Sequence, residues 1–373
     1  MTTKIEFIGV PFTASDHVFM TRALQLAEQG LYSTMPNPRV GCVIVKDGKI
    51  VGEGTHLKAG EPHAEVFALR QAGAQSSGAT AYVTLEPCSH TGRTPPCADA
   101  LVKAGVSKVI AAMQDPNPLV AGKGLAYLQA NQIEVASGLM QLQAQALNPG
   151  FISRMTRQTP YVRCKIASSL DGKTALNNHQ SQWITSEHAR LDVQKWRAQS
   201  CAILTGIGTV LSDDPSMTVR DLNVDRQPLR VIVDSHLRIS PQAKILQGGN
   251  TLIAFAQDSE NKSDALVANG AELICIPNAN HKGCLKSLLS HLAHMQINEV
   301  LVEGGEGLNG ALLSLNLIDE LILYYAPKLM GSQAKGLFDM PALTEMRQAI
   351  ALDVFELRQI GGDIRVRAKP KYA

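Results

Sequence analysis

The sequence lacks a long hydrophobic run, an excess of one charge and a basic cluster. No segment reaches the roughly 18 consecutive apolar residues that a membrane-spanning helix needs. The 35 basic and 33 acidic residues give a formal net charge of +2, and no block of Lys or Arg offers a footprint for a polyanion. We therefore expect neither a membrane span nor a nucleic-acid partner.

A secretory signal and a disulfide framework are also missing. The first 20 residues carry Lys4, Glu6 and Asp16, with no continuous apolar core and no small-residue cleavage site. Seven cysteines, an odd number, fit thiols or metal ligands better than paired disulfides. We expect a soluble protein of the cytoplasm.

At 373 residues and 45% apolar content, the chain exceeds the size at which one hydrophobic core usually stops growing. The pattern of elements is interrupted by Pro149-Gly150 and by a polar, basic stretch up to Pro160. No internal repeat is present. The sequence predicts two domains, at residues 1–150 and 151–373.

Both halves alternate between helical and strand patterns, which predicts two α/β domains in series. In the first half we expect helices at 14–30, 63–72 and 97–104, and strands at 40–45, 49–52, 79–85 and 108–112, with a hairpin turn at Asp47-Gly48. In the second half we expect helices at 187–198 and 286–295, and strands at 161–167, 201–205, 230–234, 251–255, 272–276 and 299–302.

Three residues of the first half have the character of metal ligands. His63 opens a predicted helix, Cys88 follows a buried strand, and Cys97 begins the next helix. One imidazole and two thiolates suit Zn²⁺, and three protein ligands leave a fourth position for water, as a catalytic zinc requires. Two alternatives stay open: the cysteines are ordinary buried thiols, or His56 or His90 completes a structural zinc site.

Glu65 lies two residues after His63 and is the candidate general acid/base. A catalytic zinc site needs a proton shuttle, because the bound water loses a proton and the leaving amine gains one. The order H-x-E followed by P-C…C matches the signature of zinc deaminases, but eight residues rather than two separate the cysteines here.

A glycine-rich segment, GGEGLNG at 304–310, follows the predicted strand 299–302 and precedes a helix expected from Ala311. Glycines let a backbone approach a pyrophosphate, and amides at a helix start attract its charge. A Rossmann domain is excluded, because only 63 residues follow Gly310 and few of them are clearly strand-forming. A phosphate-binding loop of another dinucleotide fold and a plain strand-to-helix turn both remain.

Longer motifs resemble the bifunctional deaminase/reductase family of riboflavin biosynthesis. In the first half they are PNPRVGC at 36–42, GEPHAE at 60–65 and CSHTGRTPPC at 88–97; in the second half they are CKIASSLDGK at 164–173, SQWITS at 181–186 and GIGTVLSDDP at 206–215. The resemblance implies a cytidine-deaminase-like three-layer domain, followed by a dihydrofolate-reductase-like domain that uses NADPH.

By this resemblance, the first domain deaminates 2,5-diamino-6-(5-phosphoribosylamino)pyrimidin-4-one, and the second reduces the ribosyl group to ribityl. His63, Cys88 and Cys97 would bind zinc, and Glu65 would move the proton. The residues implied to contact the substrate of the first domain are Asn37, His56, His90 and Arg93. A homo-oligomer is implied as well.

The same resemblance assigns the second site. Its cofactor contacts would be Ala167, Trp183, Thr209, Asp213, Ser235, Gly304, Gly305, Gly307 and Gly310. Its substrate contacts would be Ser181, Arg197, Arg220 and Glu303. Arginines can pair bidentately with a phosphate, and a carboxylate can orient sugar hydroxyls. Lys165 and Asp213 are candidates for proton handling.

Two rival functions remain at this stage. One is a deaminase of free nucleosides, or of a base in RNA, with a nucleotide-binding second domain; the near-neutral charge opposes RNA. The other is a nucleotide sensor with a structural zinc, in which zinc loss would unfold the first domain and no deaminase activity would exist.

Overall fold

The chain divides into two units, Met1–Gln158 and Thr159–Ala373. The structure, a computed structural model, describes residues 12–89, 96–118, 120–178, 180–277 and 281–372. The sequence placed the break at residue 150, where the structure instead begins helix α6 (Pro149–Arg157), with its proline in the first turn. Proline suits that position because its missing N–H would have no helical partner there.

In the described ranges, no helix combines the length and the apolar character needed to cross a membrane.

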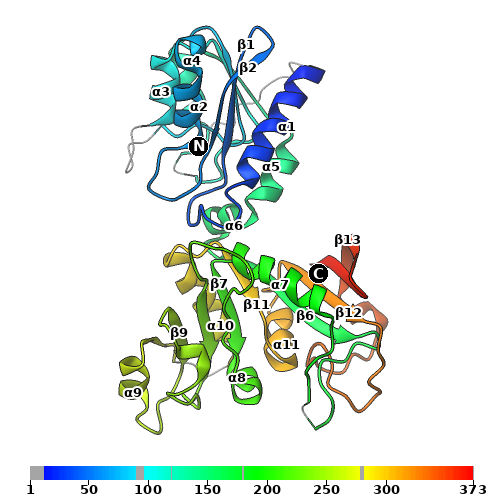
Figure 1. The fold of residues 1–373 in the computed structure, drawn as a ribbon. Helices are drawn as coiled ribbons and strands as arrows, with labels where there is room; N and C mark the ends of the chain where they lie inside the picture. The colour runs from blue at the N-terminus through cyan, green and yellow to red at the C-terminus, as the bar shows by residue number, and fades with distance from the viewer. Residues whose placement is uncertain (1–11, 90–95, 119, 179, 278–280, 373) are drawn as a thin grey trace. The chain divides into compact units, whose positions relative to one another are not determined.

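The first unit is a five-stranded sheet between helices. Its elements are α1 (Ala14–Glu28), β1 (Gly41–Lys46), β2 (Lys49–Thr55), α2 (Ala64–Ala72), the 3-10 helix η1 (Gly73–Ser76), β3 (Thr80–Val83), α3 (Cys97–Lys103), β4 (Lys108–Ala111), α4 (Lys123–Ala130), β5 (Glu134–Ser137), α5 (Gln141–Leu147) and α6. The strand order is β2-β1-β3-β4-β5. Helices α2, α3 and α4 cover one face, and α1 and α5 cover the other (Figure 1).

The expected hairpin is confirmed at β1 and β2. The two strands are antiparallel, and Asp47 and Gly48 at their turn have φ of 50° and 74°, as a two-residue hairpin turn requires. Strand β3 pairs antiparallel with β1 and parallel with β4, and β4 pairs parallel with β5. The three-layer arrangement expected for the first domain is therefore present.

Helix α2 lies unusually close to β2. A Cβ atom built on Gly54 would be 1.9 Å from the carbonyl oxygen of Ala64, the first residue of α2, and one on Gly52 would be 2.1 Å from that of Ala68. Only hydrogen fits at either position. The close approach fixes the start of α2, where His63 and Glu65 lie.

Replacing Gly54 with Ala should therefore destabilise the first unit by about 3 kcal/mol, because the added methyl group must push α2 away from the sheet. Scanning calorimetry, which can resolve the melting of the first unit from that of the second, would measure the change. The matched control is Gly48→Ala, because nothing lies within 4 Å of a Cβ there and only its positive φ opposes alanine, at roughly 1 kcal/mol. Equal shifts of the melting temperature for both variants would contradict the prediction.

The second unit is built on a nine-stranded sheet. Its strands are β6 (Tyr161–Ser169), β7 (Ala202–Gly206), β8 (Leu229–Val233), β9 (Thr251–Phe255), β10 (Ala271–Cys275), β11 (Glu299–Val302), β12 (Glu320–Ala326), β13 (Ala351–Ile360) and β14 (Asp363–Lys371). Its helices are α7 (Glu187–Gln199), α8 (Ile207–Asp213), α9 (Ser263–Ala268), α10 (His281–His294) and α11 (Glu306–Ser314), with 3-10 helices η2 (Lys244–Leu246) and η3 (Met346–Gln348).

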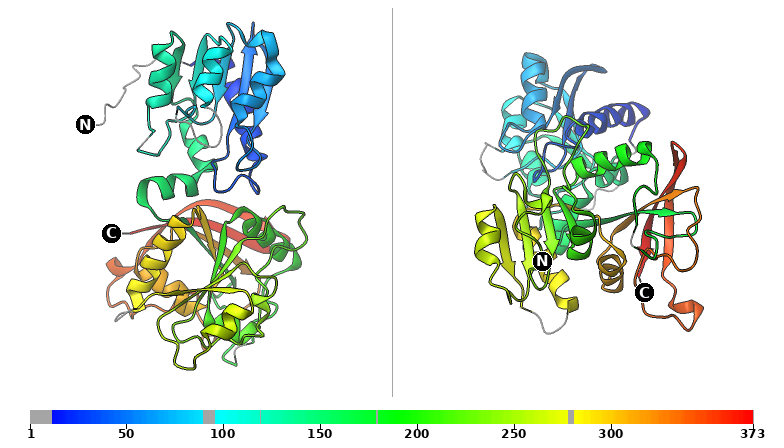
Figure 2. Two further views of the ribbon diagram at one scale, coloured as in Figure 1. Left: turned by 90° about the vertical axis from the view of Figure 1, so that its left-hand side faces the viewer. Right: turned by 60° about the horizontal axis from the view of Figure 1, so that its bottom comes forward.

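The order of this sheet is β10-β9-β8-β7-β11-β6-β12-β14-β13. All pairs from β10 to β12 are parallel, and β14 is antiparallel to both of its neighbours. Side chains of the central strands alternate between two faces: Leu204 packs with α10 and α11, whereas Ile203 packs with α8. Figure 2 shows helices on both sides of this sheet. The second α/β domain is thus a layered, mostly parallel sheet.

The expectation that few strand-forming residues follow Gly310 was wrong, because β12, β13 and β14 all lie after it. Charged residues obscured two of these strands. In β14, Arg365 and Arg367 are paired with Glu356 of β13, and Arg367 also with Glu320 of β12. Each of these arginines pairs with a residue of a neighbouring strand, and that partner is not visible in the local sequence. The charged segment therefore resembles a loop in the sequence.

Further elements were missing from the sequence prediction or differ from it. Helices α4, α5, α6, α8 and α9 and strand β5 were not expected. Helix α11 begins at Glu306 rather than at Ala311, so five of the seven residues of the glycine-rich segment are helical.

Candidate active sites

The structure brings His63, Cys88 and Cys97 together. His63 is the N-cap residue of α2, Cys88 follows β3, and Cys97 is the first residue of α3. The Nδ1 atom of His63 lies 3.2 Å from Sγ of Cys97 and 3.6 Å from Sγ of Cys88. In the described part of the chain, this is the one group of three or more metal-binding side chains whose ligand atoms all lie within 4.8 Å of one another. Its donor set, one nitrogen and two sulfurs, fits Zn²⁺.

Glu65 lies beside this cluster in an environment that disfavours its charge. The residue is 3% exposed, and its Oε2 atom has no hydrogen-bond partner among the described residues. Burial, together with the nearby Cys88, raises the pKa of Glu65 to about 7. A carboxyl group with a pKa near neutrality can both accept and release a proton at physiological pH.

The two thiols of the cluster differ in acidity. Hydrogen bonds from the Cys97 thiol and the His63 ring lower the pKa of Cys88 to about 4, although burial opposes this change. The pKa of Cys97 is raised, because its thiol is hydrogen-bonded to Cys88, is buried and faces Glu65. Without metal, Cys97 therefore keeps its proton at neutral pH.

Zinc that binds through both sulfurs must displace the Cys97 proton. The apparent zinc affinity should therefore increase with pH between about pH 6 and 8, about tenfold per pH unit for each displaced proton. Competition with a chelating dye at several pH values would measure the slope. A flat profile would show that both thiols are already ionised without metal.

Asn37 and His56 form a pair next to the cluster. The Asn37 amide donates to Nε2 of His56 over 3.1 Å, and Nδ1 of His56 lies 3.1 Å from the Pro62 carbonyl oxygen. The ring centroids of His56 and His63 are 5.2 Å apart. Burial lowers the pKa of His56. Both nitrogens of His56 are thus engaged, and the ring is not positioned as a fourth metal ligand. His90 and Arg93 lie outside the described residues.

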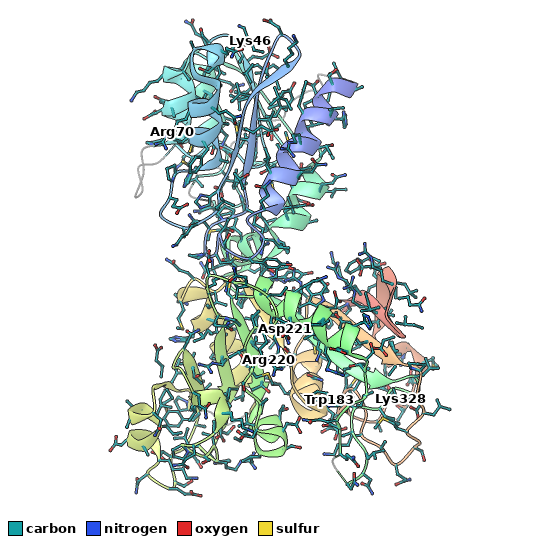
Figure 3. All side chains as sticks on the ribbon, viewed as in Figure 1. Lys46, Arg70, Trp183, Arg220, Asp221 and Lys328 are labelled. Atoms are coloured by element: carbon teal, nitrogen blue, oxygen red, sulfur yellow. The ribbon has the colours of Figure 1, made fainter. Side chains whose placement is uncertain are left out.

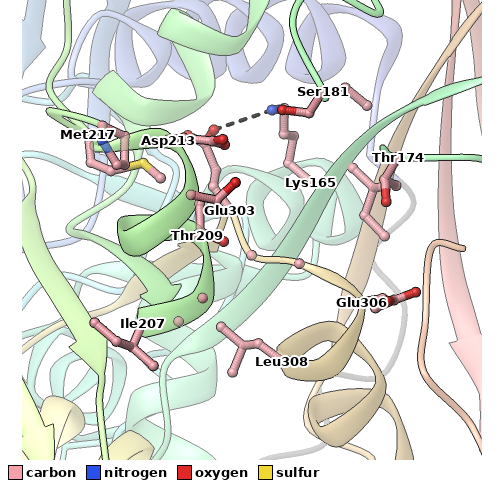
Figure 4. A pocket seen from close by; sticks show the side chains of 18 of the residues that line it. Lys165, Thr174, Ser181, Ile207, Thr209, Asp213, Met217, Glu303, Glu306 and Leu308 are labelled. Atoms are coloured by element: carbon pink, nitrogen blue, oxygen red, sulfur yellow. Dashed lines mark hydrogen bonds and ion pairs between the residues drawn. The ribbon is translucent and has the colours of Figure 1, made fainter. Parts of the chain in front are cut away.

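The second unit contains a cavity of about 1290 Å³. It is lined by twelve of the thirteen residues that the sequence assigned to this site: Ala167, Ser181, Trp183, Arg197, Thr209, Asp213, Arg220, Ser235, Glu303, Gly304, Gly305 and Gly307. Figure 4 shows the cavity from close by, and Figure 3 places Trp183 and Arg220 on the second unit.

The cavity lies where the strand order reverses. The chain runs from β7 outward through β8, β9 and β10, and then returns to place β11 between β7 and β6. Helix α8 follows β7 and packs on one face of the sheet, whereas α11 follows β11 and packs on the other. Ligands of open α/β sheets bind in the crevice that such a divergence leaves at the carboxyl ends of the strands.

Gly304 and Gly305 occupy this crevice at the start of α11, with Gly305 as its N-cap residue. A Cβ atom on Gly305 would be 4.0 Å from Oγ1 of Thr209 in α8, so the two helix starts are neighbours. Exposed amides at the first turn of α11 can bind a phosphate.

Gly310 lies elsewhere. It is not among the lining residues of the cavity, and a Cβ atom there would lie 1.9 Å from the carbonyl oxygen of Asp339. A close backbone contact thus requires glycine at this position.

Glu303 is held between two cations at the end of β11. Arg197 of α7 contacts it through Nε at 2.6 Å and through Nη2 at 3.1 Å, and Nζ of Lys165 lies 3.2 Å away (Figure 4). Burial would raise the pKa of Glu303, but the charges of Arg197 and Lys165 hold it at about 2. The carboxylate is therefore permanently ionised. Arg197 also donates to the Thr218 carbonyl over 2.8 Å.

Arg190, Arg220, Lys244 and Lys335 also line the cavity. The Arg190 guanidinium lies 4.5 Å from the centroid of the Trp183 ring, a cation–π contact that the sequence did not suggest. Arg220 is exposed, and its backbone N–H donates to Gln194. Asp213 ends α8 and is also exposed.

Sequence reasoning missed Glu86, which lies two residues before Cys88 and is 5% exposed. The sequence contained a signal for this residue. A carboxylate directly after the buried strand pattern 79–85 is expected to be removed from water, so it must have a hydrogen-bond or ionic partner.

Two family models match the chain. Residues 13–113 match the cytidine and deoxycytidylate deaminase zinc-binding region, and residues 160–366 match the RibD C-terminal domain.

Full-length relatives are similar as well. The chain is 51% identical over 364 residues to the riboflavin biosynthesis protein RibD of Escherichia coli K12, covering 94% of this chain and 98% of that protein. It is 50% identical over 372 residues to RibD of Haemophilus influenzae, covering 96% and 99%.

Solved structures agree with these sequence matches. Acinetobacter baumannii RibD, form 1, superposes with a TM-score of 0.90 at 49% identity, covering 96% of this chain and 99% of that one. The diaminohydroxyphosphoribosylaminopyrimidine deaminase/5-amino-6-(5-phosphoribosylamino)uracil reductase of Thermotoga maritima superposes with a TM-score of 0.84 at 33% identity, with the same coverage.

Proposed function

The chain belongs to the RibD family of bifunctional riboflavin-biosynthesis enzymes, which joins a zinc deaminase to an NADPH-dependent reductase, and we propose how its residues divide the two reactions. The first unit deaminates 2,5-diamino-6-(5-phosphoribosylamino)pyrimidin-4-one. The second reduces the ribosyl group of the product to ribityl. The observation that carries the proposal is the buried Glu65, with its unpartnered oxygen, next to His63, Cys88 and Cys97.

In the first unit, His63, Cys88 and Cys97 hold the zinc ion. When bound, zinc lowers the pKa of a water molecule and supplies the nucleophile for hydrolysis. Glu65 takes the proton of the nucleophile on its carboxylate and returns it to the leaving amino group, a role that a pKa of about 7 suits.

Asn37 and His56 orient the pyrimidine. Because the His56 ring accepts from Asn37 and faces the Pro62 carbonyl, each side chain limits the rotation of the other. Burial keeps His56 neutral by lowering its pKa. A neutral pair of fixed orientation can recognise the donors and acceptors of a pyrimidine edge without competing for the metal.

In the second unit, the first turn of α11 and Thr209 bind the phosphates of the dinucleotide. When bound, NADPH supplies the hydride. Ala167, Trp183, Asp213 and Ser235 complete the cofactor contacts, since all of them line the same cavity. Gly310 takes no part in cofactor binding, because it packs against the backbone of Asp339.

Glu303, Lys165 and Arg197 hold the sugar part of the substrate. The Glu303 carboxylate stays ionised and accepts sugar hydroxyls, while Lys165 and Arg197 fix its orientation. Arg197 is occupied by Glu303 and by the Thr218 carbonyl. Arg220, which is exposed and lines the same cavity as Ser181, pairs with the substrate phosphate.

The function is tested by incubating the protein with the phosphoribosylamino-pyrimidine substrate and following ammonia release and NADPH oxidation together. Glu65→Gln should abolish ammonia release, at least about 1000-fold, because the amide cannot carry the proton. The same variant should oxidise NADPH normally when the deaminated compound is supplied, and it should keep its zinc.

Two results would overturn these assignments. Ammonia release by Glu65→Gln at the wild-type rate would remove Glu65 from the mechanism. If the wild-type protein leaves NADPH untouched in the presence of the deaminated compound, the second unit does not carry out the proposed reduction.

Glu303→Gln should lower kcat/KM of the reduction by about 100-fold or more. The substitution keeps the shape of the side chain but leaves the buried Arg197 and Lys165 without their counter-charge. Ammonia release should not change. The control is Glu260→Gln, because Glu260 also forms a lysine ion pair, with Lys262, but its side chain is 63% exposed. Equal effects of the two substitutions would refute the role of Glu303.

A further inference from the structure

Glu86 is a buried carboxylate surrounded by backbone N–H groups. Its Oε1 atom accepts from Gly124 at 2.8 Å and from Leu125 at 3.3 Å. Its Oε2 atom accepts from Asp115 at 3.0 Å and from Gly122 at 2.9 Å. All four partners are donors, so an ionised carboxylate fits this position and an amide does not.

These contacts cap helix α4 from a distance. The N-cap residue of α4 is Gly122, which has no side chain to accept the N–H groups of the first turn. Glu86 supplies that acceptor from a point 36 residues earlier in the chain. The favourable dipole at the start of α4 adds to the attraction. A structural cap of α4 is therefore part of what Glu86 does.

The same contacts also fasten the segment that carries Cys88. The Glu86 backbone N–H donates to the Met113 carbonyl over 3.0 Å. A Cβ atom on Gly124 would lie 1.9 Å from the Pro87 carbonyl oxygen, so the first turn of α4 packs directly against Pro87. One residue separates Glu86 from Cys88, and its proline ring fixes φ. A shift of Glu86 is thus passed on to Cys88.

Cys88 is held on its other side by α3. The Cys97 N–H donates to Sγ of Cys88 over 3.3 Å, and the Ala98 N–H donates to the Cys88 carbonyl over 3.1 Å. The start of α3 thus holds both the sulfur and the carbonyl of Cys88, while Glu86 holds the backbone two residues earlier. Both are needed for a sulfur atom to stay within bonding distance of a metal held by His63 and Cys97.

We propose that Glu86 is a positioning residue for the zinc site, which holds Cys88 at the distance from His63 and Cys97 that zinc requires. This inference rests on the proposed ligand set. Residues that orient metal ligands usually change metal affinity by 10- to 100-fold when they are replaced. We expect Glu86→Gln to weaken zinc binding by about that factor.

The experiment measures the zinc dissociation constant of the full-length protein by competition with a chelating dye, at constant pH, together with the melting temperature. The variants are Glu86→Gln and, as matched control, Leu128→Ala. Leu128 is a fully buried residue of the same helix α4, so its truncation leaves a cavity and lowers the melting temperature without removing a contact of Glu86. Glu86→Gln should lose zinc affinity at least tenfold, whereas Leu128→Ala should melt earlier and keep wild-type affinity.

Zinc affinity of Glu86→Gln within twofold of wild type would overturn the proposal, and so would an equal loss in Leu128→Ala, which would mark a general effect of instability. If Glu86→Gln does not fold, Glu86→Asp decides, because it keeps the negative charge but withdraws the carboxylate from the four N–H groups of Asp115, Gly122, Gly124 and Leu125. A tenfold loss in that variant supports the proposal, and unchanged affinity overturns it.

Cys88→Ser separates this inference from the assignment of the ligands. If Cys88→Ser retains wild-type zinc affinity, the proposed ligand set fails. If it loses zinc while Glu86→Gln keeps it, the ligand set stands and only the positioning role of Glu86 falls.

Discussion

A carboxylate that is removed from water needs a partner, and this constraint organises both active sites. Glu303 is paired with Arg197 and Lys165, which connects β11, α7 and β6 around the cavity. Glu86 is surrounded by four backbone N–H groups and connects the end of β3 to α4. In Glu65, which lies beside the His63–Cys88–Cys97 cluster, one oxygen has no partner among the described residues. There the cost of burying the carboxylate raises its pKa to about 7.

The geometry of parallel strands explains why residues far apart in sequence meet in the second unit. Seven neighbouring strands, from β10 to β12, are parallel, so their carboxyl ends lie along one edge of the sheet. Thr209, Ser235 and Glu303 follow three of these ends, after β7, β8 and β11. Because β11 returns between β7 and β6, the helices that follow β7 and β11 diverge. The cavity is a consequence of this topology, and the side chains only give it its chemistry.

The sequence predicted those features that depend on local pattern. Strand β11 has the expected bounds, and the hairpin turn lies at Asp47-Gly48. The meeting of His63, Cys88 and Cys97 is not local, but it was predicted because their residue types and motifs are those of a zinc site. The fold class is confirmed for both units. What failed depends on partners distant in the chain: β14 is hidden by arginines that pair with Glu356 and Glu320, and the role of Glu86 depends on N–H groups about 30 to 40 residues later. The functional roles assigned to the site residues stay predictions.

Glu65 and Glu303, the glutamates proposed for the two reactions, show why residue type alone does not define a role. Burial raises the pKa of Glu65 to about 7, whereas two cations hold that of the equally buried Glu303 at about 2. Hydrolytic deamination needs a group that gains and loses a proton near neutral pH. Reduction of the sugar adds a hydride to carbon and a proton to the ring oxygen, for which Lys165 and Asp213 are the candidate donors, while a fixed charge such as Glu303 orients the hydroxyls. Each environment therefore suits the role proposed for its glutamate.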